Sequence, residues 1–391
     1  MGKRTKERSV RAEHLTYEAK TNLGGFYTPK HIVNKLYETL AKFVLPDEID
    51  ALLEPNCGYG ALLDHEYARK IKKVVGADID IKAQEIAKNA FSHAKFYHIN
   101  ALKNVARSAY EIGDSDRLLI VANPPYNDLT SQVKNGVKKN ICQIDEDIQR
   151  RDLGLSSLLG FNKLRPDFIA VLHPLSYLIK KTNFNALKPF MKNYALRSAT
   201  VFNSQAFLDA SKLNGFPVLI AIYQKSESGT SYEDIYHWRF DTIENDSFSL
   251  SQFDYIGKYI DKYPNKRGDR SGYLFYTMRD INALKRSRTF IDEEIANAVH
   301  ISDEKLDYYC YVDIFKDYAD NLPYYMGNLD IPIDDKRFGP LRESFRALSV
   351  AKHRKIFANK IKAPTPDILR LSKANVQTYF NELFNRKSNE N

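Results

Sequence analysis

Short apolar runs alternate with helical patterns through the first 225 residues of this 391-residue chain. Apolar positions recur at helical spacing over 30–45, and a second helix is expected over 81–91. Six apolar runs bounded by polar or glycine-rich turns predict buried strands at 51–53, 74–77, 96–99, 118–122, 168–172 and 218–223. Alternating strands and helices predict an α/β fold, a mostly parallel, doubly wound sheet covered on both faces. Such a sheet binds its ligand outside the carboxyl ends of its strands.

The pattern changes after Lys225. The sequence SESGTSYED is typical of a boundary loop. Beyond it the chain becomes rich in tyrosine, contains the only tryptophan, Trp238, and loses the alternation of strands and helices. We therefore expect two domains, 1–228 and 229–391, the second an α+β domain.

Polar clusters follow the first two predicted strands. Glu54 to Gly60 reads EPNCGYG, and its glycines would let the backbone approach a ligand closely. No Lys-Ser/Thr pair follows, which excludes a Walker phosphate loop. Asp78 ends the second strand, where a carboxylate can accept hydrogen bonds from ribose hydroxyls or cap a helix. The full Gly-x-Gly-x-x-Gly pattern of nicotinamide and flavin sites is missing.

The tetrapeptide Asn123-Pro124-Pro125-Tyr126, directly after the fourth strand, is the most specific signal. The prolines remove backbone donors and stiffen the chain. The Asn123 amide oxygen and the Pro124 carbonyl could then accept from one amino group, which would make an aryl amine more nucleophilic. Tyr126 offers a flat face on which a planar substrate could stack.

These motifs occur in a known order. The series is Gly25 to Pro29 (GFYTP), Glu54 to Gly60, Asp78, Asn100 to Leu102, Asn123 to Tyr126, Ile169 to Leu178 and Phe216 to Lys225. It resembles the motif order of gamma-type adenine-N6 DNA methyltransferases over roughly residues 24–225. The resemblance implies a Rossmann-like methyltransferase domain with a C-terminal target-recognition domain, S-adenosylmethionine as cofactor, and a restriction–modification setting.

The resemblance also implies a role for each motif residue. The implied cofactor contacts are Tyr27 and Thr28 at the methionine end, Glu54, Asn56 and Gly58 along the pocket, Asp78 at the ribose, Ile79 on the cofactor adenine, and Asn100, Ala101 and Asn123 beside it. Many members of the family have an aspartate where this chain has Asn100, whose amide oxygen could still accept a hydrogen bond.

At the substrate, the resemblance implies that Asn123, Pro124, Pro125 and Tyr126 are catalytic. A flipped-out adenine would stack between Tyr126 and a second aromatic ring. Phe207 is favoured over Phe216 for that ring, although a core role is as compatible with either. His173 is expected to be structural.

Two other functions are compatible with parts of the pattern. Enzymes that methylate an amine or amide of RNA or protein also use Asn-Pro-Pro-Tyr. The Phe26 to Pro29 segment and the long C-terminal domain favour DNA. A non-catalytic binding module would require a damaged Asn123 or Tyr126, and both are intact.

Charge agrees with a polyanionic partner. The formal net charge is +9, the pI is about 9.1, and the excess lies in the first 225 residues. One acid-free basic stretch spans 180–197. A second cluster spans 352–362, where Arg354 and Lys355 are expected to contact DNA phosphates, unless these residues form only a solvated surface.

The expected partners are double-stranded DNA and a cognate restriction endonuclease. No Cys/His cluster suggests a metal site. The chain has neither a transmembrane-length apolar run nor a secretory signal. We therefore expect a cytoplasmic protein.

Overall fold

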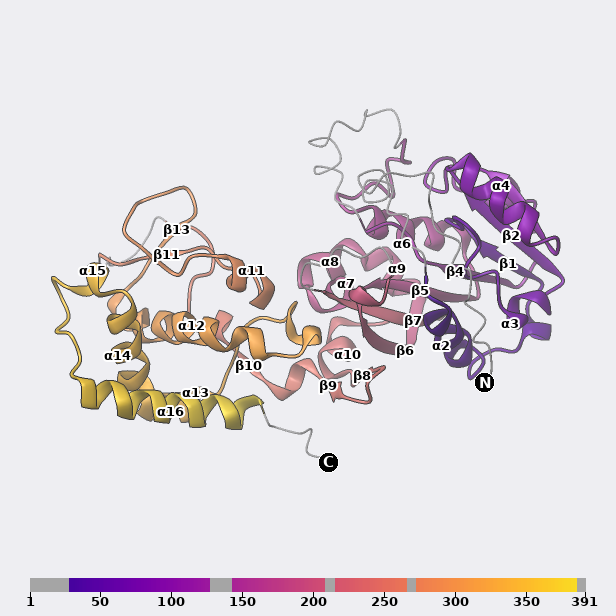
Figure 1. The fold of residues 1–391 in the computed structure, drawn as a ribbon. Helices are drawn as coiled ribbons and strands as arrows, with labels where there is room; N and C mark the ends of the chain where they lie inside the picture. Colours follow the sequence, from indigo (N-terminus) through magenta and orange to yellow (C-terminus); the bar gives the residue numbers. More distant parts are fainter. Residues whose placement is uncertain (1–27, 127–142, 208–214, 266–271, 385–391) are drawn as a thin grey trace, which may run out of the picture. The chain divides into compact units, whose positions relative to one another are not determined.

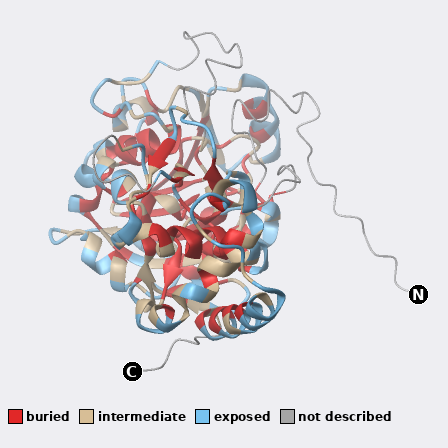
Figure 2. Ribbon diagram, turned by 90° about the vertical axis from the view of Figure 1, so that its left-hand side faces the viewer, coloured by how far each residue is buried: buried red, intermediate tan, exposed pale blue. Residues whose placement is uncertain are grey.

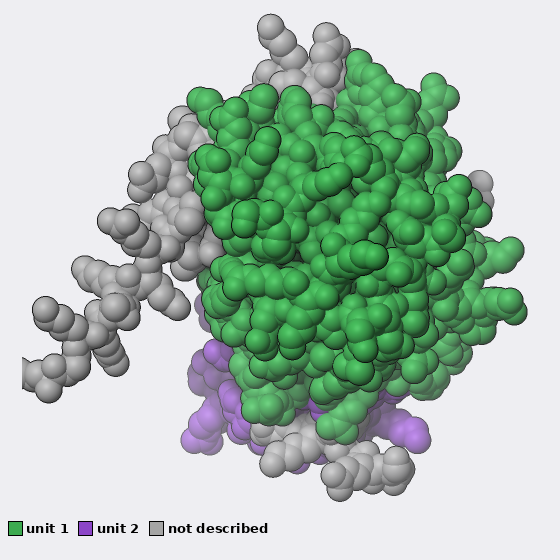
Figure 3. Space-filling view, turned by 90° about the vertical axis from the view of Figure 1, so that its right-hand side faces the viewer, with its two compact units in different colours: residues 1–246 green, residues 247–391 purple. Residues whose placement is uncertain are grey.

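The structure is a computed structural model that describes residues 28–126, 143–207, 215–265 and 272–384. The chain divides into two compact units, residues 1–246 and 247–391 (Figure 3).

The first unit is built on one large sheet (Figure 1). All six strands expected from the sequence are present, with bounds shifted by a few residues at most. Strands β1 to β5 are parallel, whereas β7 runs antiparallel between β5 and β6. In spatial order the strands of this unit are β3 (Ala94–His98), β2 (Lys73–Asp78), β1 (Ala51–Glu54), β4 (Leu118–Ala122), β5 (Phe168–Pro174), β7 (Pro217–Lys225), β6 (Tyr194–Asn203) and β8 (Phe240–Thr242).

Helices cover both faces of this sheet. On one face, α2 and α3 pack on alternate strand residues such as Leu52, Leu119 and Ile220. On the other face, Phe190 of α9 packs on Tyr223 of β7 with ring centroids 5.0 Å apart. The α-helices in the described residues of this unit are α2 (Lys30–Leu40), α3 (Glu66–Arg69), α4 (Ile81–Ala90), α6 (Leu153–Leu164), α7 (Ser176–Ile179), α8 (Lys181–Ala186), α9 (Lys188–Asn193) and α10 (Tyr232–His237). The strand order with a reversed β7 confirms the expected Rossmann-like methyltransferase fold.

The boundary between the units lies later than the expected 228/229. Residues 229–246 belong to the first unit because they contain α10 and β8, and β8 pairs with β6 in the large sheet. The Thr230 hydroxyl ties the intervening loop to β6: it donates to the carbonyl of Tyr194 and accepts from the amide of Leu196. The composition changes at residue 226, but the packing changes only after residue 246.

The second unit is mostly helical, with short strands. Strands β10 (Asp254–Tyr255) and β14 (Pro332–Ile333) pair antiparallel, and β11 (Leu274–Tyr276) lies between β12 (Phe290–Ile291) and β13 (Ala298–His300). Aromatic side chains of α12, α14 and α16 fill its core, and Figure 2 shows the buried residues lining the inner faces of helices. The remaining elements are β9 (Ser247–Phe248), α11 (Ile281–Arg286), α12 (Leu306–Tyr318), α13 (Asp335–Phe338), α14 (Arg342–Lys352), α15 (Arg354–Phe357) and α16 (Pro366–Phe384).

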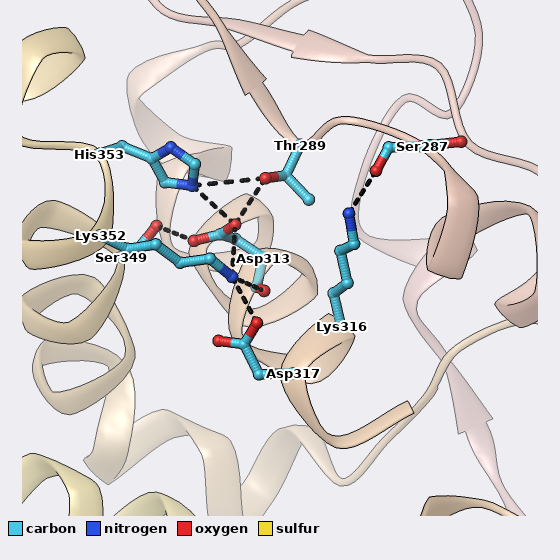
Figure 4. Close-up of polar contacts among 8 residues, drawn as sticks. All are labelled: Ser287, Thr289, Asp313, Lys316, Asp317, Ser349, Lys352 and His353. Carbon is cyan, nitrogen blue, oxygen red and sulfur yellow. Dashed lines mark hydrogen bonds and ion pairs between the residues drawn. The ribbon is translucent and has the colours of Figure 1, made fainter. Parts of the chain in front are cut away.

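One carboxylate inside the second unit joins several of these elements. Asp313 of α12 is fully buried and accepts hydrogen bonds from Thr289, Ser349 and His353 at 2.6, 2.7 and 2.9 Å (Figure 4). The Lys352 ammonium lies 3.5 Å from it. A buried carboxylate is stable only when its oxygens are paired in this way.

Candidate active site at the strand ends

Polar residues from four parallel strands gather at one edge of the large sheet. Glu54, Asp78 and Asn123 end or directly follow β1, β2 and β4, and Asn100 follows β3 closely. Parallel strands end at the same edge, so these residues face the same space. The strand order reverses between β1 and β4, which is where doubly wound sheets form their binding crevice.

The turn after β1 leaves room for a ligand. It is fixed by a 2.8 Å hydrogen bond from the amide of Cys57 to the carbonyl of Ala77. Gly58 has a φ of +47°, and a Cβ placed there would meet no atom within 4 Å. Gly60, at φ +79°, instead packs so closely on Phe91 that a Cβ would lie 2.6 Å from its ring. Gly58 therefore faces open space, whereas Gly60 is required by packing.

The turn also holds the Asp78 carboxylate in place. The amides of Gly58 and Asp80 donate to its two oxygens at 2.7 and 2.8 Å. Burial raises the pKa of Asp78 above its usual value, and these backbone hydrogen bonds only partly offset that effect. Each oxygen keeps a lone pair for a further donor, as a ribose diol would require.

Two buried acceptors at or just after the end of β1 have no partner among the described residues. They are Oε2 of Glu54 and Oδ1 of Asn56. Burial, and then the nearby Asp78, raise the pKa of Glu54 well above its usual range. Unpaired buried acceptors are costly, so these two oxygens are suited to a ligand that carries hydroxyl or ammonium donors.

Asn123 is held between two other side chains. Its Nδ2 donates to Oγ1 of Thr28 at 3.0 Å, and its Oδ1 accepts from the Tyr126 hydroxyl. That hydroxyl also lies 3.0 Å from the carbonyl of Leu172. Tyr27 lies outside the described residues.

Asn100 already makes two hydrogen bonds of its own. Its Oδ1 accepts from the amide of Leu102 at 3.0 Å, and its Nδ2 donates to the carbonyl of Gln143 at 2.8 Å. The amide of Asp145 donates to the carbonyl of Leu102 at 2.8 Å. An aspartate could not donate to Gln143, which explains the use of an amide. The expected cofactor contact would have to use the second lone pair of Oδ1.

Ile79 and Ala101, two further expected cofactor contacts, differ in solvent exposure. Ile79 is 43% exposed directly after Asp78, a position from which it can pack on a flat ring. Ala101 is half-buried, and its carbonyl faces α6, where a Cβ at Gly160 would lie 3.8 Å away.

Phe207 differs from its expected role. It is 4% exposed and belongs to the core beneath the sheet, with its ring centroid 5.6 Å from that of Phe202. In this arrangement it has no free face for a substrate base. Phe216, just before β7 at the same edge of the sheet, is 37% exposed. Phe216 is therefore the better placed of the two aromatic candidates.

His173 is a core residue, in agreement with the structural role expected for it. Its Nε2 lies 2.9 Å from the Tyr223 hydroxyl and its Nδ1 lies 3.0 Å from the carbonyl of Pro174. Complete burial lowers the pKa of His173 to about 4, so the ring is neutral at physiological pH.

The basic clusters are only partly available to a ligand. Lys352 binds Asp317 and Asp313, and Lys360 lies over the ring of Tyr273. Arg354 and Lys355 are exposed and form no ion pair within the described ranges. The 180–197 stretch runs from the end of α7 through α8 and α9 into β6.

In the described part of the chain, no group of three or more His, Cys, Asp or Glu side chains is placed to hold a metal ion. None of the helices described there is long and apolar enough to cross a bilayer.

Comparisons with known proteins show a similarity of fold and none of sequence family. No protein-family model and no curated protein matches the chain. A putative RNA methyltransferase from Pyrococcus horikoshii is similar in structure, with 15% identity and a TM-score of 0.36 over 53% of this chain and 89% of that chain. A putative class I S-adenosylmethionine-dependent methyltransferase from Listeria monocytogenes has 14% identity and a TM-score of 0.39, over 57% and 65% of the two chains.

The N-methyltransferase NodS from Bradyrhizobium japonicum, in complex with S-adenosyl-L-homocysteine, has 12% identity and a TM-score of 0.33, over 51% and 87%. Such low values carry no information on the substrate of this chain.

Proposed function

We propose that this protein is an S-adenosylmethionine-dependent methyltransferase that methylates N6 of an adenine flipped out of double-stranded DNA. The observation that carries the proposal is the position of Asn123. It follows β4 at the point where the strand order reverses, at the same edge of the sheet as Glu54 and Asp78. A donor of methyl groups and an amine acceptor could thus meet at one edge of the sheet.

The pocket residues fit the proposed cofactor. Asp78 would accept from the ribose hydroxyls, and the unpaired oxygens of Glu54 and Asn56 would accept from its ammonium group or from water. Gly58 leaves space for close approach of the ligand, and Ile79 offers an apolar surface. When bound, S-adenosylmethionine supplies a methyl group on a positively charged sulfur, which keeps the electrons of the broken carbon–sulfur bond.

Asn123 and Pro124 would prepare the amine. Two oxygens that accept from the amino hydrogens draw its lone pair away from the aromatic ring, so that the lone pair can form the new nitrogen–carbon bond. The methylated nitrogen then loses one proton to water. The leaving group is neutral and the methyl donor is already activated, so positioning can supply most of the rate enhancement.

DNA as the substrate explains further features of the chain. Adenine N6 lies inside the duplex, so the base must leave the stack, and the ring of Tyr126 would receive it. Phe216 could stack on the other face. Arg354 and Lys355 would contact phosphates, and the second unit would read the sequence around the target. The same proposal includes a restriction–modification setting with a cognate endonuclease.

Product analysis tests this function directly. The protein is incubated with S-adenosylmethionine carrying a labelled methyl group and with duplex DNA, and the DNA is digested to nucleosides. N6-methyladenine is the expected product, and Asn123→Ala should abolish most of the rate while S-adenosylhomocysteine still binds.

Parallel incubations with RNA and with protein distinguish the alternatives. N4-methylcytosine, or methyl transfer to RNA or protein only, would contradict the proposal.

A further inference from the structure

The carboxamide of Asn123 must present the correct end to its substrate. Oxygen accepts hydrogen bonds, whereas the NH2 group only donates. The two ends are similar in size, and the torsion that exchanges them has a broad, roughly two-fold profile. An amide turned the wrong way would point donors at the amino hydrogens and lose one of the two acceptors. A side chain that fixes the orientation of this amide is therefore important for the rate.

Thr28 is in position to fix that orientation. Its Oγ1 lies 3.0 Å from Nδ2 of Asn123, a residue 95 positions away in the sequence. The Tyr126 hydroxyl donates to the opposite end of the amide. With Nδ2 on Thr28, one lone pair of Oδ1 remains for the substrate amine.

The backbone around Thr28 makes it a firm anchor. Thr28 is 3% exposed and is followed by Pro29, whose carbonyl accepts from the amides of Ile32 and Val33 at 3.0 and 3.1 Å in the first turn of α2. Ile32 and Val33 are themselves buried in the core. The packing of α2 against the core thus holds the backbone of Thr28, and with it the hydroxyl, in place.

We propose that Thr28 is a positioning residue that accepts a hydrogen bond from Nδ2 of Asn123 and so turns the amide oxygen toward the amine to be methylated. This inference rests on the proposed function. It differs from the role implied by the family resemblance, in which Thr28 contacts the methionine end of the cofactor. The two roles predict different kinetic effects.

The test compares Thr28→Val, which keeps the shape but removes the hydroxyl, with Thr28→Ser, which keeps the hydroxyl. Thr28→Val should lower kcat at least tenfold, with the Kd of S-adenosylhomocysteine, measured by calorimetry, within about threefold of wild type. Thr28→Ser should restore most of kcat. The matched control is Thr39→Val, because Thr39 is a buried threonine of α2 whose hydroxyl binds only the carbonyl of Lys35.

A second measurement does not depend on activity. In protein labelled with 15N at asparagine, the side-chain amide signal of Asn123 is identified by its loss in Asn123→Asp. Thr28→Val should shift this signal, whereas Thr39→Val should not. An unchanged signal overturns the inference even if no methyl transfer is found for the wild type.

Activity data can overturn it separately. A Thr28→Val enzyme with unchanged kcat and weakened S-adenosylhomocysteine binding would show that Thr28 contacts the cofactor and does not position Asn123. Wild-type protein that methylates no adenine would instead contradict the proposed function, and the amide signal would still decide the role of Thr28. If Thr28→Val does not fold, Thr28→Ala is measured against Thr28→Ser in the same way.

Discussion

Single side chains at the strand ends already show which ligand atoms they could bind. Both carboxylate oxygens of Asp78 accept hydrogen bonds from backbone amides, whereas Oε2 of Glu54 and Oδ1 of Asn56 have no hydrogen-bond partner within the described ranges. Asn123 uses both ends of its amide in contacts with Thr28 and Tyr126. The residues expected to bind the cofactor therefore include acceptors without a hydrogen-bond partner. Asn123, expected to bind the target base, already has a partner at each end of its amide.

Glu54 makes cofactor binding sensitive to pH. Burial and the neighbouring Asp78 raise its pKa, which favours the protonated form in the free protein. A bound ammonium group would favour the charged form, so binding should release a proton and affinity should rise with pH until the raised pKa is passed. Calorimetry in buffers of different ionisation enthalpy measures this proton. Glu54→Gln should bind more weakly and release none; an equal release from both proteins would assign the proton elsewhere.

Tyr126 should act through its ring more than through its hydroxyl. Tyr126→Phe loses one neutral hydrogen bond, worth about 0.5–1.5 kcal/mol, so its rate should stay within about tenfold of wild type. Tyr126→Ala loses the stacking surface, worth roughly 1–3 kcal/mol, and should flip the base poorly. Fluorescence of 2-aminopurine at the target position reports flipping. Normal flipping by Tyr126→Ala would contradict the stacking role.

For these residues, the sequence predicts the place in the sheet better than it predicts the side-chain contacts. Asp78 and Asn123 could be placed at one edge because they follow predicted parallel strands. The contact of Asn100 with Gln143 and the inward direction of Phe207 depend on loops whose course is set by distant packing. No local pattern contains that information.

Secondary-structure elements were predictable where both faces of a strand are buried. Strands β4 and β5 are continuous apolar runs because helices cover the sheet on both sides. Strand β6 was not expected, since its outer residues include Arg197 and Ser198, which interrupt the apolar pattern. Helix α12 is buried on most sides, so its apolar residues show no single helical face.

Helix α12 owes its attachment to α14 partly to the Asp313 carboxylate. Burial acts to raise the pKa of Asp313, but the hydrogen bond and charge of His353 and the charge of Lys352 outweigh it, so the pKa lies below its usual value. A lowered folded-state pKa contributes stability above the unfolded value of about 4, and this is lost as the pH falls through the folded value. We expect Asp313→Asn to destabilise the second unit by about 3–5 kcal/mol at neutral pH.

Hydrogen exchange of the α12 amides, followed between neutral and acidic pH, measures this contribution. Wild-type protection should fall at low pH and approach that of Asp313→Asn, whose protection should change less. Ser349→Ala is the control, because it removes one donor but leaves the carboxylate and His353 in place. Parallel pH curves for wild type and Asp313→Asn would contradict a charged Asp313.

At the scale of the whole molecule, the formal net charge is +9, and Arg354 and Lys355 of the second unit are exposed without an ion pair in the described part of the chain. If Arg354 and Lys355 contact phosphates, Arg354→Ala/Lys355→Ala should weaken DNA binding and reduce the slope of log affinity against log salt by about 2. Arg370→Ala is the control, since Arg370 already pairs with Asp367. A slope that stays at the wild-type value would identify a plain solvated surface.

The pairing of β8 with β6 determines where such a protein can be cut and rejoined. A chimera that exchanges the second unit should keep residues 229–246 with the first unit, because a junction at residue 228 would divide the large sheet from α10 and β8. The earlier junction would also separate Thr230 from β6 and leave two backbone groups there without their partner. Chimeras joined at residue 228, near the change in composition, should therefore aggregate. Chimeras that keep residues 229–246 with the first unit should remain folded.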